Sequence, residues 1–353
     1  MQDLIKFILL LIIMLVLLKR SLNLGLVMMI SSLLIALFYM IEPLVFIDTV
    51  FHSIIEKDTL TLLVLLVLIS YLEKLLNQSG QLEKMILSLE RYFPQDRIRL
   101  TLMPAFFGFL ASPGGAMFSA PFVQKAAEPL GISPERKTFI NYWFRHLWEY
   151  VLPTYPGVLL AVSLLNIEFF VFFKIVYVYT IAAVLIGIIF GLMPIKTDKK
   201  EGSDTAVNGR LIDLLLGILP IAVLLVSVIV FKFNIILTLT LILIIMLIYY
   251  KIPVKKAYQI LKSSISYKIL LSVIGIFIFK DVLKVSTMAK GLSDFFSQTG
   301  IHESILFLIL PLTVGFLTGA VQAAVGITFP ILIDLVNPRD HLNLFGFAFV
   351  AGV

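Results

Sequence analysis

Long apolar runs are the feature that most limits what this chain can fold into. Several runs of about 20 residues are rich in Leu, Ile, Val and Phe, and about 20 apolar residues are what an α-helix needs to cross a bilayer. The chain as a whole is 60% hydrophobic and 14% charged, with a mean hydropathy of +1.04. This composition lies outside the range of soluble domains, so we expect an all-α polytopic membrane protein in contact with the lipid bilayer.

The apolar runs fall into two sets separated by a polar stretch. The first run resembles a signal-peptide core, but no small-x-small cleavage site follows it, so we interpret it as a retained span. Two mixed segments, 42–58 and 252–267, predict amphipathic helices along the membrane surface. The expected spans are 4–18, 22–41, 59–76, 138–165 and 167–194, then 211–231, 233–250, 268–286 and a segment from about Leu342.

Two segments of the chain share a pattern. PAFFGFLASPGGAMFSAP begins at Pro104, and PLTVGFLTGAVQAAVGITFP begins at Pro311, 207 positions later. At this offset the Gly-Phe-Leu of one segment falls on that of the other, and the preceding spans superpose. Chance alignment of apolar sequence is the alternative. We expect two related units, 1–194 and 210–353, joined by a cytoplasmic linker at 195–209.

Each shared segment breaks into small residues within apolar sequence, which predicts a re-entrant hairpin that enters and leaves the membrane on one side. With hairpins here, most lysines and arginines sort to one face. Basic loops remain in the cytoplasm, so we expect a multi-pass protein of the inner (cytoplasmic) membrane with its amino terminus external. A full span at the first segment would spoil this sorting.

The number of spans sets the orientation of the second unit. The first unit contains an odd number, so the second is expected to insert upside down. The predicted fold is therefore an inverted repeat in which each unit holds three helices, a re-entrant hairpin and two helices. The second unit lacks its last span and a half, so we expect the native chain to continue beyond Val353 by about one helix.

Two motifs resemble a known family. Gly-Phe-Leu-x-Ser-Pro-Gly-Gly-Ala-Met at 108–117 and Arg-His-Leu-Trp-Glu-Tyr-x-Leu-Pro-Thr-Tyr-Pro-Gly at 145–157 are similar to the DUF401 membrane family. The arrangement of spans resembles the ion transporter superfamily, which includes divalent anion/sodium symporters and citrate and gluconate carriers. The resemblance implies a scaffold and a transport domain that move as an elevator, and a homodimer formed through scaffold helices. The Ser-Asn-Thr hairpin tip of the dicarboxylate symporters is absent, so their ligands are not carried over.

The tip of the first hairpin has the residues of a helix start. Ser112 can accept a backbone N–H as N-cap, and Pro113 fits the first helical position. Gly114 and Gly115 then leave backbone N–H groups uncovered, and a helix amino terminus favours an anion. A tight turn with glycines for close packing is the alternative.

The second hairpin offers a comparable tip. Thr318, Gly319 and Gln322 supply a hydroxyl, a bare backbone and an amide in apolar surroundings. We expect them to bind the same solute as the first tip. Interhelical hydrogen bonding between small-residue faces is equally compatible with these residues.

Ionisable residues occur inside the fourth expected span. Arg145 and Glu149 are four apart and share a helical face, with His146 beside them. An ion pair that locks the helix is one interpretation. The other is that Arg145 neutralises an anionic solute, since a guanidinium can bind a carboxylate or phosphate in two places, while Glu149 or His146 carries a proton.

The same span contains Pro153-Thr154-Tyr155-Pro156-Gly157, which cannot sustain helical hydrogen bonding. Irregular backbone at membrane depth is tolerated only where protein or water covers it. We therefore expect Thr154 and Tyr155 to line the solute cavity. A simple kink without a ligand role is the alternative.

These features favour a secondary active transporter of a small, anionic solute, coupled to a Na⁺ or H⁺ gradient. A lipid or polyprenyl-phosphate translocase of the same fold is the alternative. An enzyme is not expected, because the four histidines are scattered, cysteine is absent and no H-E-x-x-H or G-x-S-x-G motif occurs. No cofactor, metal or nucleic-acid partner is indicated. The solute, the coupling ion, the direction of transport and the oligomeric state are not specified by the sequence.

Overall fold

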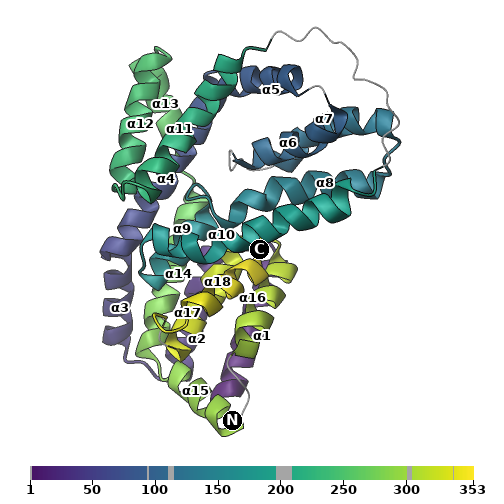
Figure 1. Ribbon diagram of the computed structural model, residues 1–353. Helices are drawn as coiled ribbons and strands as arrows, with labels where there is room; N and C mark the ends of the chain where they lie inside the picture. Colours follow the sequence, from purple (N-terminus) through teal and green to yellow (C-terminus); the bar gives the residue numbers. More distant parts are fainter. Residues whose placement is uncertain (1, 94, 110–114, 196–208, 300–303, 337) are drawn as a thin grey trace. The chain divides into compact units, whose positions relative to one another are not determined.

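The computed structural model describes residues 2–93, 95–109, 115–195, 209–299, 304–336 and 338–353. Over this part of the chain every regular element is a helix (Figure 1). The chain forms two compact units. Unit 1 comprises Met1–Val67, Pro156–Ile175 and Ile265–Val353, and unit 2 comprises Leu68–Tyr155 and Val176–Ser264.

Unit 1 is built from helices of both ends of the chain and from one segment of its middle, Pro156–Ile175. Two long helices, α4 (Lys57–Gln78) and α10 (Phe169–Ile186), contribute residues to both units. The other helices of unit 1 are α1 (Gln2–Lys19), α2 (Leu24–Phe38), α3 (Pro43–Ile55), α9 (Pro156–Leu165), α14 (Tyr267–Val285), α15 (Met288–Thr299), α16 (Ser304–Thr318), α17 (Val321–Leu335) and α18 (Leu342–Gly352).

Unit 2 holds the middle of the chain. Its α10 helix continues as a π-helical turn, η3 (Gly187–Leu192). The other elements are α5 (Gln81–Tyr92), α6 (Asp96–Phe109), α7 (Gly115–Ala127), η1 (Glu128–Leu130), α8 (Pro134–His146), η2 (Leu147–Tyr150), α11 (Leu211–Ile229), α12 (Ile235–Tyr249) and α13 (Val254–Ser264).

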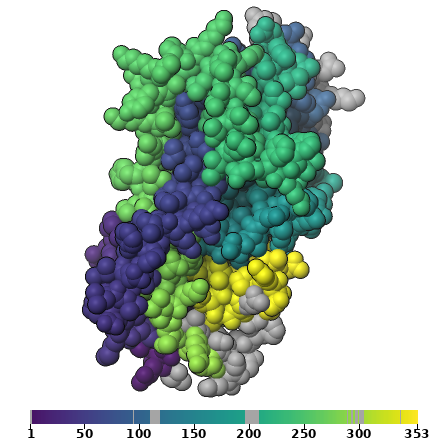
Figure 2. All heavy atoms as spheres, turned by 90° about the vertical axis from the view of Figure 1, so that its left-hand side faces the viewer, coloured from purple at the N-terminus to yellow at the C-terminus, as the bar shows by residue number. Residues whose placement is uncertain are grey.

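The helices agree with a membrane protein. Three of the described helices are long and apolar enough to cross a bilayer: Lys57–Gln78, Phe169–Leu192 and Leu211–Ile229. Large apolar side chains are also exposed on shorter helices, such as Leu44 and Ile47 of α3, which lies in dark purple on the face shown in Figure 2. In water such exposure would be costly, whereas lipid accepts it.

One expected span is interrupted earlier than the prolines alone indicate. The run predicted as a helix over 138–165 is α8, which ends at His146, followed by the 3₁₀ turn η2 and irregular backbone before α9. Pro153 and Pro156 lack the N–H groups that would bond to the carbonyls of residues 149 and 152. The regular α-helical hydrogen bonds are therefore already interrupted in the turn before Pro153.

Helices recur at the offset of 207 that separates Pro104 from Pro311. The bounds of α5, moved by this offset, are those of α15, and α6 and α7 fall within two residues of α16 and α17. The same offset relates α8 to α18 within one residue. Each unit therefore combines the first helices of one half of the chain with the later helices of the other half.

The shared Gly-Phe-Leu has a packing reason. A Cβ added at Gly108 of α6 would collide with the backbone carbonyl of Arg145 in α8, and a Cβ at Gly315 of α16 would collide with that of Gly352 in α18. Arg145 and Gly352 are themselves 207 positions apart. In both units the first arm of a helical pair thus touches the backbone of the helix that follows it, which only glycine permits.

We expect Gly108→Ala and Gly315→Ala each to lower the free energy of unfolding by about 2 kcal/mol or more, because over-packing of this kind typically costs 1–3 kcal/mol and here the obstacle is backbone. Thermal and denaturant unfolding in detergent would measure the change. Gly191→Ala is the matched control, since its added Cβ would come no closer than 3.4 Å to the Phe139 ring. Equal stability of all three variants would contradict the close approach.

Candidate functional site

The tip between α16 and α17 is a tight turn centred on Gly319. Gly319 has a φ of +60°, in the left-handed region that glycine adopts without cost. The Thr318 hydroxyl donates to the Val314 carbonyl at 2.7 Å and accepts the Ala320 N–H at 3.3 Å. Thr318 therefore stabilises the turn itself, and one lone pair of its oxygen stays available.

A cavity of about 380 Å³ lies at this tip, within unit 1. Five segments of the unit line it: the α1–α2 turn, α4 at Leu66, the first turns of α9 and α14, and the hairpin tip. Most of its wall is apolar. Its polar residues are Asn23, Lys268, Ser272, Thr318 and Gln322.

The polar residues of the cavity differ in how far they are already engaged. Asn23 accepts the Gly25 N–H at 2.8 Å and donates to the Lys268 carbonyl at 3.0 Å, so it ties α2 to α14. Ser272 donates to the same carbonyl at 2.8 Å. The Gln322 amide and the exposed Lys268 ammonium have no side-chain partner among the described residues, and they are the groups best able to meet a solute.

Two helix amino termini meet beside the cavity. Pro156 begins α9 and Val321 begins α17, and a Cβ added at Gly157 would lie 2.5 Å from Cγ1 of Val321. The first N–H groups of a helix lack intrahelical partners and carry a partial positive charge. With Lys268, they give this end of the cavity a positive potential that suits an anion.

A second polar cluster lies in unit 2, where α8 passes into η2. Nη1 of Arg145 is 3.5 Å from Oε1 of Glu149, and Nε2 of His146 is 3.7 Å from the same oxygen. Arg145 is only 6% exposed. The cluster has the internal ion pair that the four-residue spacing predicts, and its groups are held against one another.

The irregular backbone after η2 is fixed to the end of α6. The Tyr155 hydroxyl donates to the Gly108 carbonyl, and the Trp148 indole N–H donates to the Ala105 carbonyl at 2.7 Å. The Thr154 hydroxyl is buried and has no hydrogen-bond partner among the described residues. A buried, unpaired hydroxyl is costly, so Thr154 is the residue of this segment that most requires a ligand or a water.

The predicted site residues thus fall into three groups. Thr318, Gly319 and Gln322 form the hairpin tip, and Thr318 and Gln322 line the cavity. Arg145, His146 and Glu149 form one cluster, with Thr154 and Tyr155 following it in the chain. Ser112, Pro113 and Gly114 lie outside the described residues, and Gly115 is described only as the start of α7.

Two residues of the cavity were not anticipated from the sequence. Asn23 precedes an apolar run and could have been recognised as an N-cap, which it is. Lys268 precedes another apolar run, where a basic residue by itself indicates only the orientation of the span. Nothing in the local sequence indicates that these two helix starts meet, because they are 245 positions apart.

Glu149→Gln is expected to destabilise unit 2 by about 3 kcal/mol, because it removes the carboxylate that pairs with the buried Arg145 charge. Thermal unfolding of the purified protein would measure this. Lys125→Gln is the matched control: it breaks the Lys125–Glu90 pair, whose lysine side chain is 58% exposed, and such pairs contribute about 0–1 kcal/mol. A smaller loss for Glu149→Gln than for the control would contradict a structural ion pair.

Comparison with known proteins agrees with the two sequence motifs. A comparison with curated proteins finds no match. A family model described as "Protein of unknown function (DUF401)" matches residues 4–349, nearly the whole chain. The chain therefore belongs to the DUF401 family.

Proposed function

We propose that the protein is a secondary active transporter of a small anionic solute, driven by a Na⁺ or H⁺ gradient. The observation that carries the proposal is the cavity at the α16–α17 tip, which combines a bare glycine turn, an unengaged amide and a lysine. Its volume of about 380 Å³ is at the small end of ligand sites, which typically hold 300–1,000 Å³. The proposed solute is accordingly small.

The chemistry of the cavity favours an anion. Lys268 supplies a full positive charge, and the amino termini of α9 and α17 add partial ones. None of the residues that line the cavity is acidic. Gln322 can donate two hydrogen bonds to a carboxylate or phosphate while the apolar wall covers the rest of the solute.

We further propose that α6–α7 and α16–α17 are re-entrant hairpins of an inverted repeat. The recurrence of helices at an offset of 207, the matched glycine contacts and the odd number of expected spans support this arrangement. In the predicted topology Lys19, Arg20 and Lys268 face the cytoplasm. The cavity, which adjoins the α1–α2 turn and the start of α14, then opens toward the cytoplasm.

Alternating access would follow from movement of a transport domain relative to a scaffold, as the resemblance to elevator transporters implies. The Arg145 cluster is a second candidate contact for the solute or for a proton. Its ion pair supplies a charge that could exchange partners, from Glu149 to an anionic solute.

The first test is a thermal-shift screen of carboxylates, phosphate and sulfate, with and without Na⁺ and at two pH values. A ligand at 100 times its Kd raises the stability of the folded state by about 2.7 kcal/mol. Lys268→Gln and Gln322→Leu should each weaken the best anion about 10-fold or more, because a hydrogen bond to a charged group contributes about 1.5–3 kcal/mol. Lys262→Gln, an exposed lysine of α13, is the matched control.

Uptake of that anion into proteoliposomes then tests transport itself. Gly319→Val should abolish uptake while the protein still folds, because open space surrounds Gly319 but its φ of +60° disfavours a β-branched residue. Arg145→Ala tests the second cluster in the same assay. Anions that bind equally to native protein, Lys268→Gln and Gln322→Leu would rule out this cavity as the solute site.

A further inference from the structure

Unit 2 contains a groove of a different character from the cavity at the α16–α17 tip. Its volume is about 340 Å³, and every side chain that lines it is apolar or aromatic. Helices α5, α6 and α11 and the η2 turn form its walls. The lining residues are Leu89, Phe93, Leu102, Ala105, Phe106, Phe109, Trp148, Leu214 and Ile218.

Two arginines lie close to one end of the groove. Arg91 of α5 follows Leu89 by two residues, and Arg99 of α6 precedes Leu102 by nearly one helical turn. Nε of Arg99 donates to the carbonyl of Phe93 at 2.8 Å, and its Nη1 lies 3.6 Å from Oδ1 of Asp96. Arg91 and Arg99 therefore lie near the carboxyl-terminal turn of α5, where the Arg210 carbonyl accepts the Ser88 hydroxyl at 2.8 Å.

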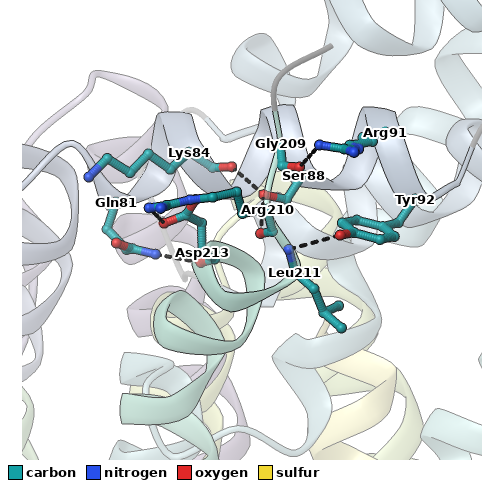
Figure 3. A network of polar contacts seen from close by, with 9 residues as sticks. All are labelled: Gln81, Lys84, Ser88, Arg91, Tyr92, Gly209, Arg210, Leu211 and Asp213. Carbon is teal, nitrogen blue, oxygen red and sulfur yellow. Dashed lines mark hydrogen bonds and ion pairs between the residues drawn. The ribbon is translucent and has the colours of Figure 1, made fainter. Parts of the chain in front are cut away.

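Figure 3 shows the hydrogen bonds that hold the chain before α11 against α5. Nη1 of Arg91 donates to the Gly209 carbonyl at 2.8 Å, and the Leu211 N–H donates to the Tyr92 hydroxyl at 3.2 Å. The Arg210 side chain extends toward Gln81 and the amino-terminal part of α5, with its Nε 3.0 Å from Oδ2 of Asp213 (Figure 3). Arg91 remains exposed. Since a guanidinium has five N–H donors, Arg91 keeps donors for a further ligand.

We propose that this groove binds an acyl chain of an anionic phospholipid, with the headgroup phosphate at Arg91 and Arg99. In a bilayer an open apolar groove fills with hydrocarbon, because it has no polar group to hold water. The arginines then select the headgroup, since the guanidinium fork matches a phosphate. In the predicted topology these arginines face the cytoplasmic leaflet, where anionic lipids attract basic residues and tyrosines lie at headgroup level.

Trp148 provides a direct probe, because it lines the groove and the chain has only two tryptophans. Its fluorescence would be measured in vesicles of phosphatidylcholine containing brominated phosphatidylglycerol or, separately, brominated phosphatidylcholine. A Trp143→Phe background isolates the signal. Should that background fail to fold, the native protein minus Trp148→Phe gives the same quantity. We expect brominated phosphatidylglycerol to quench Trp148 at a concentration several-fold lower than brominated phosphatidylcholine does.

Two kinds of variant separate the headgroup from the chain. Arg91→Gln should lower the preference for phosphatidylglycerol about fivefold, which corresponds to about 1 kcal/mol for a basic residue near an anionic surface. Arg210→Gln should change it less, because the Arg210 side chain extends toward the other end of α5 (Figure 3). Leu214→Phe, which fills the groove, should reduce quenching by both lipids. Lys255→Gln is the control, because it removes an exposed lysine of α13 that does not adjoin the groove.

Equal quenching by the two brominated lipids, unchanged in Arg91→Gln, would overturn the proposal and indicate ordinary annular contact. An effect of Lys255→Gln as large as that of Arg91→Gln would also overturn it, because the cause would then be general surface charge. Neither outcome depends on anion binding in unit 1, so this proposal and the proposed transport function fail separately.

Discussion

The chain must satisfy its backbone polar groups without water wherever it lies in lipid, and every break in its helices is constrained by this requirement. Two breaks are described in detail. At the α16–α17 tip, the Thr318 hydroxyl bonds on both sides of Gly319. After η2, Tyr155 and Trp148 donate to carbonyls of α6. In each place side chains form hydrogen bonds with backbone groups where the regular helical hydrogen bonds end. Candidate ligand-binding groups lie next to these hydrogen bonds.

The two halves of the chain are related in their contacts as well as in their helix bounds. In unit 1, Lys280 of α14 pairs with Glu56 at 3.0 Å, and Asp281 accepts the Ser53 hydroxyl at 2.7 Å. In unit 2, Lys74 donates to the carbonyl of Ser263. Lys74 is equivalent to Asp281, and Ser263 to Glu56, at the offset of 207. Helices at matching positions of the chain are thus joined in each unit near the same residues, but through different hydrogen bonds and ion pairs.

Much of the helical organisation could be predicted from the sequence, because it depends on local signals. Apolar run length gave the helices, Pro153 and Pro156 marked the break, and the spacing of Arg145 and Glu149 indicated their ion pair. The surroundings of the hairpin tip could not be predicted in this way. Asn23 and Lys268 reach the cavity because helix starts from opposite halves of the chain pack together, which no local pattern encodes. The apolar groove likewise depends on the packing of α11 with α5 and α6, which no local pattern encodes.

The glycine contacts leave the side chain of the facing residue unconstrained. Gly108 touches the carbonyl of Arg145, and Gly315 touches that of Gly352, yet Arg145 bears a guanidinium and Gly352 has no side chain. Each contact concerns only the main chain, so it is compatible with either residue. A buried cation therefore accompanies the close approach of α6 to α8, whereas the approach of α16 to α18 brings none.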